Sequence, residues 1–167
     1  HKLPDELCCY ITSGIFRSAF LYKNEIYCIP NIGNVILKFN PTTNEFVVYK
    51  EWYFKIDKFV KDKNASIFSD AIYTNNAIWC PFRQGNLLVK FDLDHMDIDI
   101  FEVGEKSNSY FSIASDGKIF WLINTEQNKI IQWNSKNNNV KVLKDISNHP
   151  ENPYFSFCIY YENYLWV

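Results

Sequence analysis

The chain repeats itself, and the repeat limits the possible folds more than any other feature of the sequence. Residues 20–28 align with residues 72–80, so that cysteine falls on cysteine and aromatic residues fall on aromatic residues. Further copies of this segment begin at residues 113 and 159. A period of about 40 to 50 residues is typical of repeat architectures in which each unit buries its apolar face against its neighbours.

The second half of each unit repeats as well. It consists of Asn, a mostly apolar run, a polar residue, an aromatic residue and then Asn or Asp, in residues 34–40, 86–92 and 128–134. An alternating run follows each copy, at residues 45–49, 97–101 and 140–143. The alternation of apolar and polar residues is the period of a β-strand.

Turn residues separate the first two strands of every unit: Lys23-Asn24, Asn75-Asn76, Asp116-Gly117 and Glu162-Asn163. Asn, Asp and Gly tolerate the positive φ of a tight two-residue hairpin, so these strands are expected to pair antiparallel. Each unit then holds four antiparallel strands, which is the blade of a β-propeller. The sequence therefore predicts an all-β fold, a β-propeller fragment of about three four-stranded antiparallel blades.

We expect one propeller-type domain over residues 1–167. Its repeat units are residues 16–52, 66–104, 109–145 and an incomplete unit at 154–167. Residues 53–64 are predicted to form a helical turn or an ordered loop, and residues 6–11 a strand before the first unit. Both ends of the chain look cut, so the remaining blades of the same propeller are expected partners.

The composition favours β-strands and limits the classes of molecule that the chain is expected to bind. The aromatic share is 18%, with only 5 Gly among 167 residues, which suits pleated and half-buried surfaces. The net charge of -2 offers no general attraction for nucleic acid or an anionic membrane, so neither is expected as a partner. No apolar run approaches the roughly 18 residues that a membrane span needs.

The five cysteines form an odd set without C-x-x-C spacing: Cys8, Cys9, Cys28, Cys80 and Cys158. Neither a disulfide framework nor a zinc site is predicted from them. Cys28 and Cys80 recur at the same place in successive repeats, where buried free thiols acting as small apolar residues explain them best. Free thiols of this kind slightly favour a reducing, cytoplasmic compartment.

No catalytic or metal-binding pattern is recognised, so no catalytic residue and no cofactor are predicted. The three histidines, His1, His95 and His149, lack metal-ligand spacing to one another, to cysteines or to carboxylates. The alternating acids of residues 92–99 lack the central Gly and distal Glu of a calcium loop. We interpret them as a turn followed by a charged edge strand, which discourages pairing with other chains.

The repeats resemble those of bacterial kelch-like propellers of the galactose oxidase central-domain type. The resemblance covers about residues 16–167 and rests on Ile-aromatic-Cys followed by Asn-x-Ile-x-Lys-Phe-Asn. The paired glycines that are usual in that family after the second strand are missing. Six-bladed propellers and seven-bladed, lyase-like propellers are therefore alternatives. The copper chemistry of galactose oxidase is not implied, because no Tyr-Cys-His-Tyr set is matched.

In a propeller, the loop between the second and third strands shares one rim with the connections between blades, and ligands usually dock there. The predicted binding residues are Asn31, Phe82, Arg83, Gln84, Glu126 and Gln127. Among them, Arg83 is the strongest candidate for a ligand contact, because the N–H donors of its planar guanidinium match the geometry of a carboxylate or a peptide. An ordinary surface arginine is the alternative interpretation.

The function predicted from these features is a non-enzymatic recognition module that binds a protein or carbohydrate ligand, a glycan, through one rim. The first alternative is part of a propeller enzyme, lyase or glycosidase-like, whose catalytic residues lie in missing blades. A purely structural role is the second alternative. An enzyme should bring carboxylates or histidines from several blades to the central channel.

Overall fold

The computed structural model describes residues 14–124, 126–145 and 155–167. The chain divides into two compact units, His1–Phe68 and Ser69–Val167, named unit 1 and unit 2 below. The strand predicted at residues 6–11 lies outside the described residues. The same is true of four residues considered above: His1, Cys8, Cys9 and His149.

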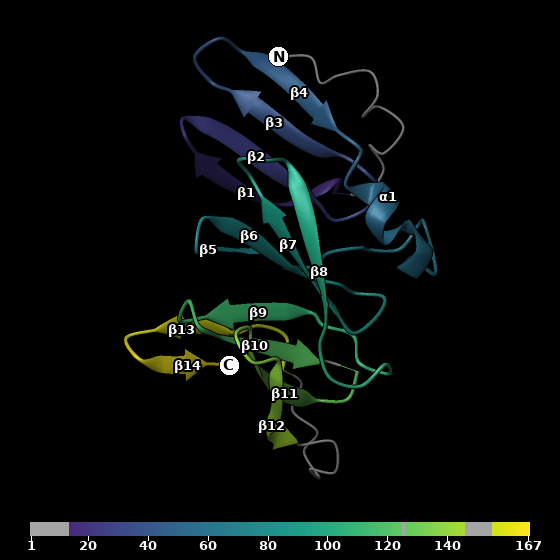
Figure 1. The fold of residues 1–167 in the computed structure, drawn as a ribbon, viewed down its shortest axis with the longest axis vertical. Coiled ribbons are helices and arrows are strands. Elements are labelled where there is room, and N and C mark those ends of the chain that lie inside the picture. Colours follow the sequence, from purple (N-terminus) through teal and green to yellow (C-terminus); the bar gives the residue numbers. More distant parts are fainter. Residues whose placement is uncertain (1–13, 125, 146–154) are drawn as a thin grey trace. The chain divides into compact units, whose positions relative to one another are not determined.

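Unit 1 contains one four-stranded antiparallel sheet with the strand order β1-β2-β3-β4 (Figure 1). Its strands are β1 (Phe16–Tyr22), β2 (Glu25–Pro30), β3 (Ile36–Asn40) and β4 (Glu45–Tyr49). A one-turn helix α1 (Tyr53–Ile56) follows, continued by the 3-10 turn η2 (Asp57–Phe59). Of the helical turn and the ordered loop that the sequence left open for residues 53–64, the structure shows the helical turn.

Unit 2 contains two more sheets of the same design and a hairpin (Figure 1). The second sheet comprises β5 (Ile72–Thr74), β6 (Ala77–Pro81), β7 (Leu87–Asp92) and β8 (Asp97–Glu102). The third comprises β9 (Ser112–Ser115), β10 (Ile119–Asn124), β11 (Lys129–Asn134) and β12 (Asn139–Asp145), and the hairpin β13 (Ile159–Tyr161) and β14 (Tyr164–Trp166). Each strand pairs antiparallel with the next, so the predicted all-β fold of about three four-stranded blades is confirmed.

Three of the four tight turns between first and second strands have the predicted two residues with positive φ; in the third sheet Asp116 bonds to Ile119, and Gly117 has the positive φ. Asn24, Asn76 and Asn163 have φ values of 63, 56 and 65°, and Gly117 has a φ of 90°. These values lie in the left-handed region that asparagine and glycine tolerate best. The repeated turn residues therefore fix the register of the first two strands.

The recurring Asn or Asp at the end of each third strand closes the following turn. The Oδ1 atoms of Asn40, Asp92 and Asn134 each accept a hydrogen bond of 2.9 Å from the backbone N–H two residues later. Asn and Asp side chains favour such turns because they mimic a backbone carbonyl. The repeat motif thus has a structural cause at each of its three copies.

Aromatic side chains fill the core of unit 2 between its second and third sheets. The ring of Trp79 lies 4.5 Å from that of Phe120 and 6.2 Å from that of Trp133, measured between centroids. Phe101 contacts Trp133 at 5.2 Å. The high aromatic content therefore serves the packing of neighbouring blades.

The cysteines follow the prediction only in part. Cys28, Cys80 and Cys158 are all free thiols, and Cys80 and Cys158 are buried. Cys28 is only half-buried, so the prediction of a buried Cys28 is wrong. It packs at the margin of a cluster formed by Val35 and Leu37, which leaves part of its surface accessible.

Candidate functional site

In unit 2 the loop between β6 and β7 is hydrogen-bonded to the connection between β8 and β9. The backbone N–H of Val103 donates to the carbonyl of Asn86 at 2.7 Å. The Asn86 side-chain amide donates to the Gly104 carbonyl at 3.2 Å, and the Tyr110 N–H donates to the Phe82 carbonyl at 3.3 Å. The two kinds of loop therefore share one rim of the second sheet, as expected.

A buried polar network extends this rim to the third sheet. The Tyr110 hydroxyl donates to the Val103 carbonyl at 2.6 Å and accepts from Asn108 Nδ2 at 3.0 Å. The Asn108 side-chain oxygen accepts from Asn124 Nδ2 at 3.1 Å. Burial raises the pKa of Tyr110 far above its ordinary value, so this hydroxyl stays a donor. The members of this network are buried and hydrogen-bonded to one another, which favours a single conformation of the rim.

The loop between β10 and β11 joins the same network. Gln127 donates its backbone N–H to Asn124 Oδ1 at 3.1 Å and its Nε2 to Ser107 Oγ at 3.3 Å. Glu126 beside it is exposed. Gln127 and Glu126 thus lie on the rim that also carries the loop of Arg83.

The guanidinium of Arg83 lies over an aromatic ring. Its guanidinium carbon lies 4.7 Å from the centre of the Phe111 ring, within the distance of a cation-π contact. Among the described residues, the N–H donors of Arg83 have no hydrogen bond or ion pair. These donors are not used by the described part of the chain, so they can donate hydrogen bonds to a ligand.

The remaining predicted residues have different positions. Phe82 is fully buried, so its side chain packs beneath the surface and cannot contact a ligand. Gln84 is half-buried next to Arg83. Asn31 belongs to unit 1, where its N–H donates to the Ile15 carbonyl and its carbonyl accepts from the Ile67 N–H, both at 2.7 Å.

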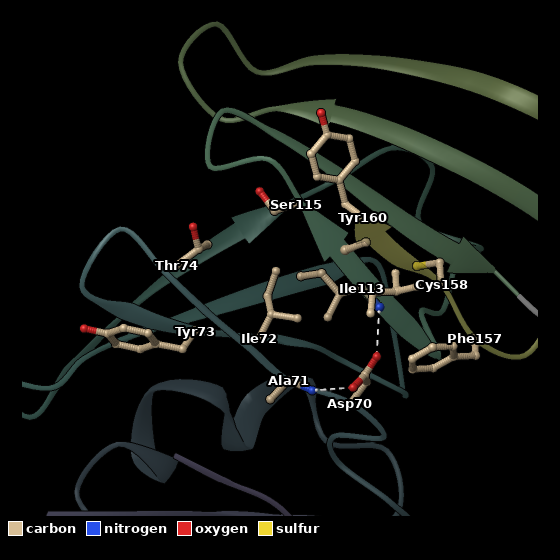
Figure 2. Close-up of a pocket in the computed structure, with 12 residues that line it drawn as sticks. Asp70, Ala71, Ile72, Tyr73, Thr74, Ile113, Ser115, Phe157, Cys158 and Tyr160 are labelled. Atoms are coloured by element: carbon tan, nitrogen blue, oxygen red, sulfur yellow. Dashed lines mark hydrogen bonds between the residues drawn. The ribbon is translucent and has the colours of Figure 1, made fainter. Parts of the chain in front are cut away.

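A pocket of about 320 Å³ lies between the first strands of the sheets of unit 2, β5, β9 and β13 (Figure 2). Asp70, just before β5, contributes a carboxylate. Its Oδ2 accepts from Ser112 Oγ at 2.6 Å and from the Ile113 N–H at 3.1 Å, and its Oδ1 accepts from the Ala71 N–H at 2.9 Å. Three donors therefore fix the carboxylate in place.

The two buried cysteines of unit 2, Cys80 and Cys158, are expected to be unreactive. Burial raises the pKa of Cys158 to about 12, although a hydrogen bond with Ser112 lowers it in part. Burial raises the pKa of Cys80 well above its ordinary value, and the negative charge of Asp70 adds to the effect. Both thiols stay protonated at neutral pH, so neither is a nucleophile.

Sequence reasoning missed Asp70 and Ser112, which lie 42 residues apart. One signal was available in the repeat. The positions equivalent to Asp70 in the other units hold Ser18, Phe111 and Phe157, so Asp70 is the one carboxylate among the four copies.

The acidic residues 92–99 form the turn between β7 and β8 and the start of β8. His95 Nδ1 lies 2.8 Å from Asp92 Oδ2, and Lys90 pairs with Asp99 across the strands at 3.0 Å. Within the part of the chain that the structure describes, no group of three or more His, Cys, Asp or Glu residues is placed to hold a metal ion. None of the helices formed by those residues is long and apolar enough to cross a membrane.

Neither a protein family model nor a curated protein sequence matches the chain. Solved structures do. The extracellular domain of BT4673 from B. thetaiotaomicron, described as a one-component system, is 14% identical with a TM-score of 0.64 over 91% of this chain and 18% of that one. An inactive variant of virginiamycin B lyase from Staphylococcus aureus, with quinupristin, is 16% identical with a TM-score of 0.57 over 84% of this chain and 44% of that one.

These similarities establish the fold alone. The chain has the fold of β-propeller blades, and it spans less than half of the length of each of these propeller proteins.

Proposed function

We propose that the chain is a non-enzymatic recognition module that binds a protein or glycan through the rim of unit 2, with Arg83 contacting a carboxylate of the ligand. One observation carries the proposal. The guanidinium carbon of Arg83 lies over the Phe111 ring, 4.7 Å from its centre, and the donors of Arg83 have no partner among the described residues. A guanidinium matches a carboxylate in geometry and can form two parallel hydrogen bonds with it.

The rest of the rim supports this role by holding the site rigid. The buried amides of Asn108 and Asn124 and the hydroxyl of Tyr110 tie together the loops that carry Arg83 and Gln127. A preorganised site loses less conformational entropy when a ligand binds. Gln84, Glu126 and Gln127 then supply polar contacts around Arg83.

An enzymatic role is the second candidate, favoured by the structural likeness to a lyase. The pocket between the first strands is the place where catalytic groups would be expected. Among the described residues that line it, Asp70 is the one carboxylate and there is no histidine. Both oxygens of Asp70 already accept hydrogen bonds from the protein, which suits binding better than proton transfer.

The kelch-like, galactose oxidase type of propeller remains a prediction from the repeat. The likeness to the extracellular domain of a signalling protein supports a ligand-binding role in a general way. We propose that the remaining blades of the same propeller are the chain's first partners and that the ligand is a separate protein or glycan.

The experiment is a screen of acidic glycans and acidic peptides, followed by calorimetric titration of the tightest ligand with wild type and variants. We expect Arg83→Ala to weaken binding about tenfold or more, because a hydrogen bond to a charged group contributes about 1.5–3 kcal/mol. The Tm should stay nearly unchanged, because surface substitutions usually alter stability by less than about 0.5 kcal/mol.

Two further variants sharpen the result. Arg83→Lys keeps the charge but loses the planar fork, so it should restore only part of the affinity. Arg17→Ala removes the chain's other arginine, which is exposed in unit 1, and should leave binding unchanged. Wild-type affinity in Arg83→Ala would remove Arg83 from the site.

A further inference from the structure

We propose that the pocket between β5, β9 and β13 is a second ligand site and that it takes a small organic cation, an ammonium group carried on an apolar body. The site shares no residue with the rim around Arg83, so it stands independently of the function proposed above. Its volume of about 320 Å³ lies at the lower end of the range of small-molecule pockets, roughly 300–1,000 Å³.

The charge of the pocket selects a cation. Of the twelve described residues that line it, Asp70 alone carries a charge at neutral pH. No lysine, arginine or histidine of the described part of the chain forms an ion pair with Asp70. A half-buried carboxylate without a counterion favours a positively charged ligand, since desolvation strengthens the attraction between them.

The hydrogen bonds of Asp70 leave room for one further donor. A carboxylate offers about four acceptor positions. Ser112, Ile113 and Ala71 occupy three of them, two at Oδ2 and one at Oδ1. The open position is at Oδ1, and the three existing donors hold the carboxylate in a fixed orientation. Figure 2 shows the two bonds from the backbone N–H groups of Ala71 and Ile113. An ammonium group can therefore bind without reorganising the side chain.

The walls of the pocket suit the apolar body of such a ligand. Ile72, Ile113 and Phe157 are among the residues that line it. Phe157 is 57% exposed, so its ring has uncovered surface. Aromatic faces attract cations electrostatically as well as packing against apolar groups. A neutral alcohol could donate to the same acceptor position but would lack the attraction between two opposite charges.

The test compares two probes that differ in charge and hardly in shape, benzylammonium and benzyl alcohol. Each is titrated into the full chain while the backbone amide signals of Ala71 and Ile113 are followed by NMR, because both amides bond to Asp70. We expect saturable shifts of both signals with benzylammonium and at least about tenfold weaker binding of benzyl alcohol. Equal binding of the two probes, or no binding of benzylammonium, would overturn the proposal.

Two substitutions test whether benzylammonium binds in this pocket. Asp70→Asn keeps the shape and removes the charge, so it should weaken benzylammonium about tenfold or more. Phe157→Ala tests the same pocket without touching the hydrogen bonds of Asp70, which matters if Asp70→Asn folds poorly. Its matched control is Phe54→Ala, an exposed phenylalanine in unit 1. Benzylammonium affinity that is unchanged in Phe157→Ala and in a folded Asp70→Asn would place the cation elsewhere and contradict the proposal.

Discussion

The Ser112 hydroxyl lies 2.6 Å from Asp70 Oδ2 and at the same time accepts the backbone N–H of Cys158 at 3.1 Å. One buried hydroxyl therefore joins the starts of β5, β9 and β13. Because these are the first strands of successive sheets, Ser112 connects neighbouring blades through hydrogen bonds in addition to the aromatic packing.

Replacing Ser112 by alanine should destabilise the protein. Ser112 is 1% exposed, and its loss leaves the buried N–H of Cys158 without that partner. An unsatisfied buried donor costs about 1–3 kcal/mol, so we expect the free energy of unfolding in urea to fall by about that amount. Ser135→Ala, in the turn between β11 and β12, is the control and should change it by less than about 0.5 kcal/mol. Equal effects of the two variants would contradict the role of Ser112.

Gly104 should be required for the rim. Its φ is +68°, and a Cβ added there would lie 2.7 Å from Asn108 Nδ2 and 3.2 Å from the Tyr110 hydroxyl. We expect Gly104→Ala to lower stability by at least about 1 kcal/mol and to weaken binding of the rim ligand. Gly85→Ala, where the nearest atoms are at 3.6 Å, is the matched control in the neighbouring loop. A Gly104→Ala protein with unchanged stability would show that the amide network tolerates displacement.

The three described thiols should differ in reactivity. Burial raises the pKa of Cys28, Cys80 and Cys158, which lowers the fraction of reactive thiolate in each. Cys28 is only half-buried, so we expect native-state iodoacetamide to label it before Cys80 and Cys158. Peptide mass spectrometry of a Cys8→Ser, Cys9→Ser background measures this directly. Labelling of Cys80 at the rate of Cys28 would mean that the second sheet opens readily.

Asp92 and His95, in the turn between β7 and β8, should form an ion pair when both are charged. The hydrogen bond with Asp92 raises the pKa of His95 above its ordinary value of 6.5, and the same bond lowers the pKa of Asp92 below 3.8. The contribution of His95 to stability is thus complete below pH 6.5 and is lost as the pH rises through its raised pKa. That of Asp92 is complete above pH 3.8 and is lost as the pH falls through its lowered pKa.

An NMR titration of the His95 ring checks this. We expect a midpoint above 6.5 in the wild type and a return toward 6.5 in Asp92→Asn. Since both side chains are well exposed, the pair should contribute little to overall stability. An identical midpoint in the two proteins would show that the contact does not persist in solution.

Local features of the fold could be predicted from the sequence because their causes are local. Asn24 and Asn76 mark turns that need positive φ, and the Asn or Asp closing each third strand bonds to the backbone two residues later. Strand alternation follows in the same way from neighbouring residues, whereas the sequence did not decide between a helical turn and an ordered loop at Tyr53–Ile56.

The site could be predicted only in outline, because its contacts join residues far apart in the chain. Phe82 and Arg83 are neighbours in one predicted loop, yet packing buries the first while the second stacks on Phe111. The Asn108 to Asn124 bond and the Asp70 to Ser112 bond depend on how adjacent sheets meet. Cys28 was expected to match Cys80, but equal positions in a repeat have unequal surroundings.

The most direct test of the proposed function is the position at which the tightest acidic glycan or peptide perturbs the backbone amide signals of the full chain. The proposal predicts saturable changes at Arg83, Gln84, Phe111 and Gln127, and their loss in Arg83→Ala. Changes centred instead on the tight turns at Asn76 and Gly117, or a wild-type pattern retained in Arg83→Ala, would contradict recognition through this rim.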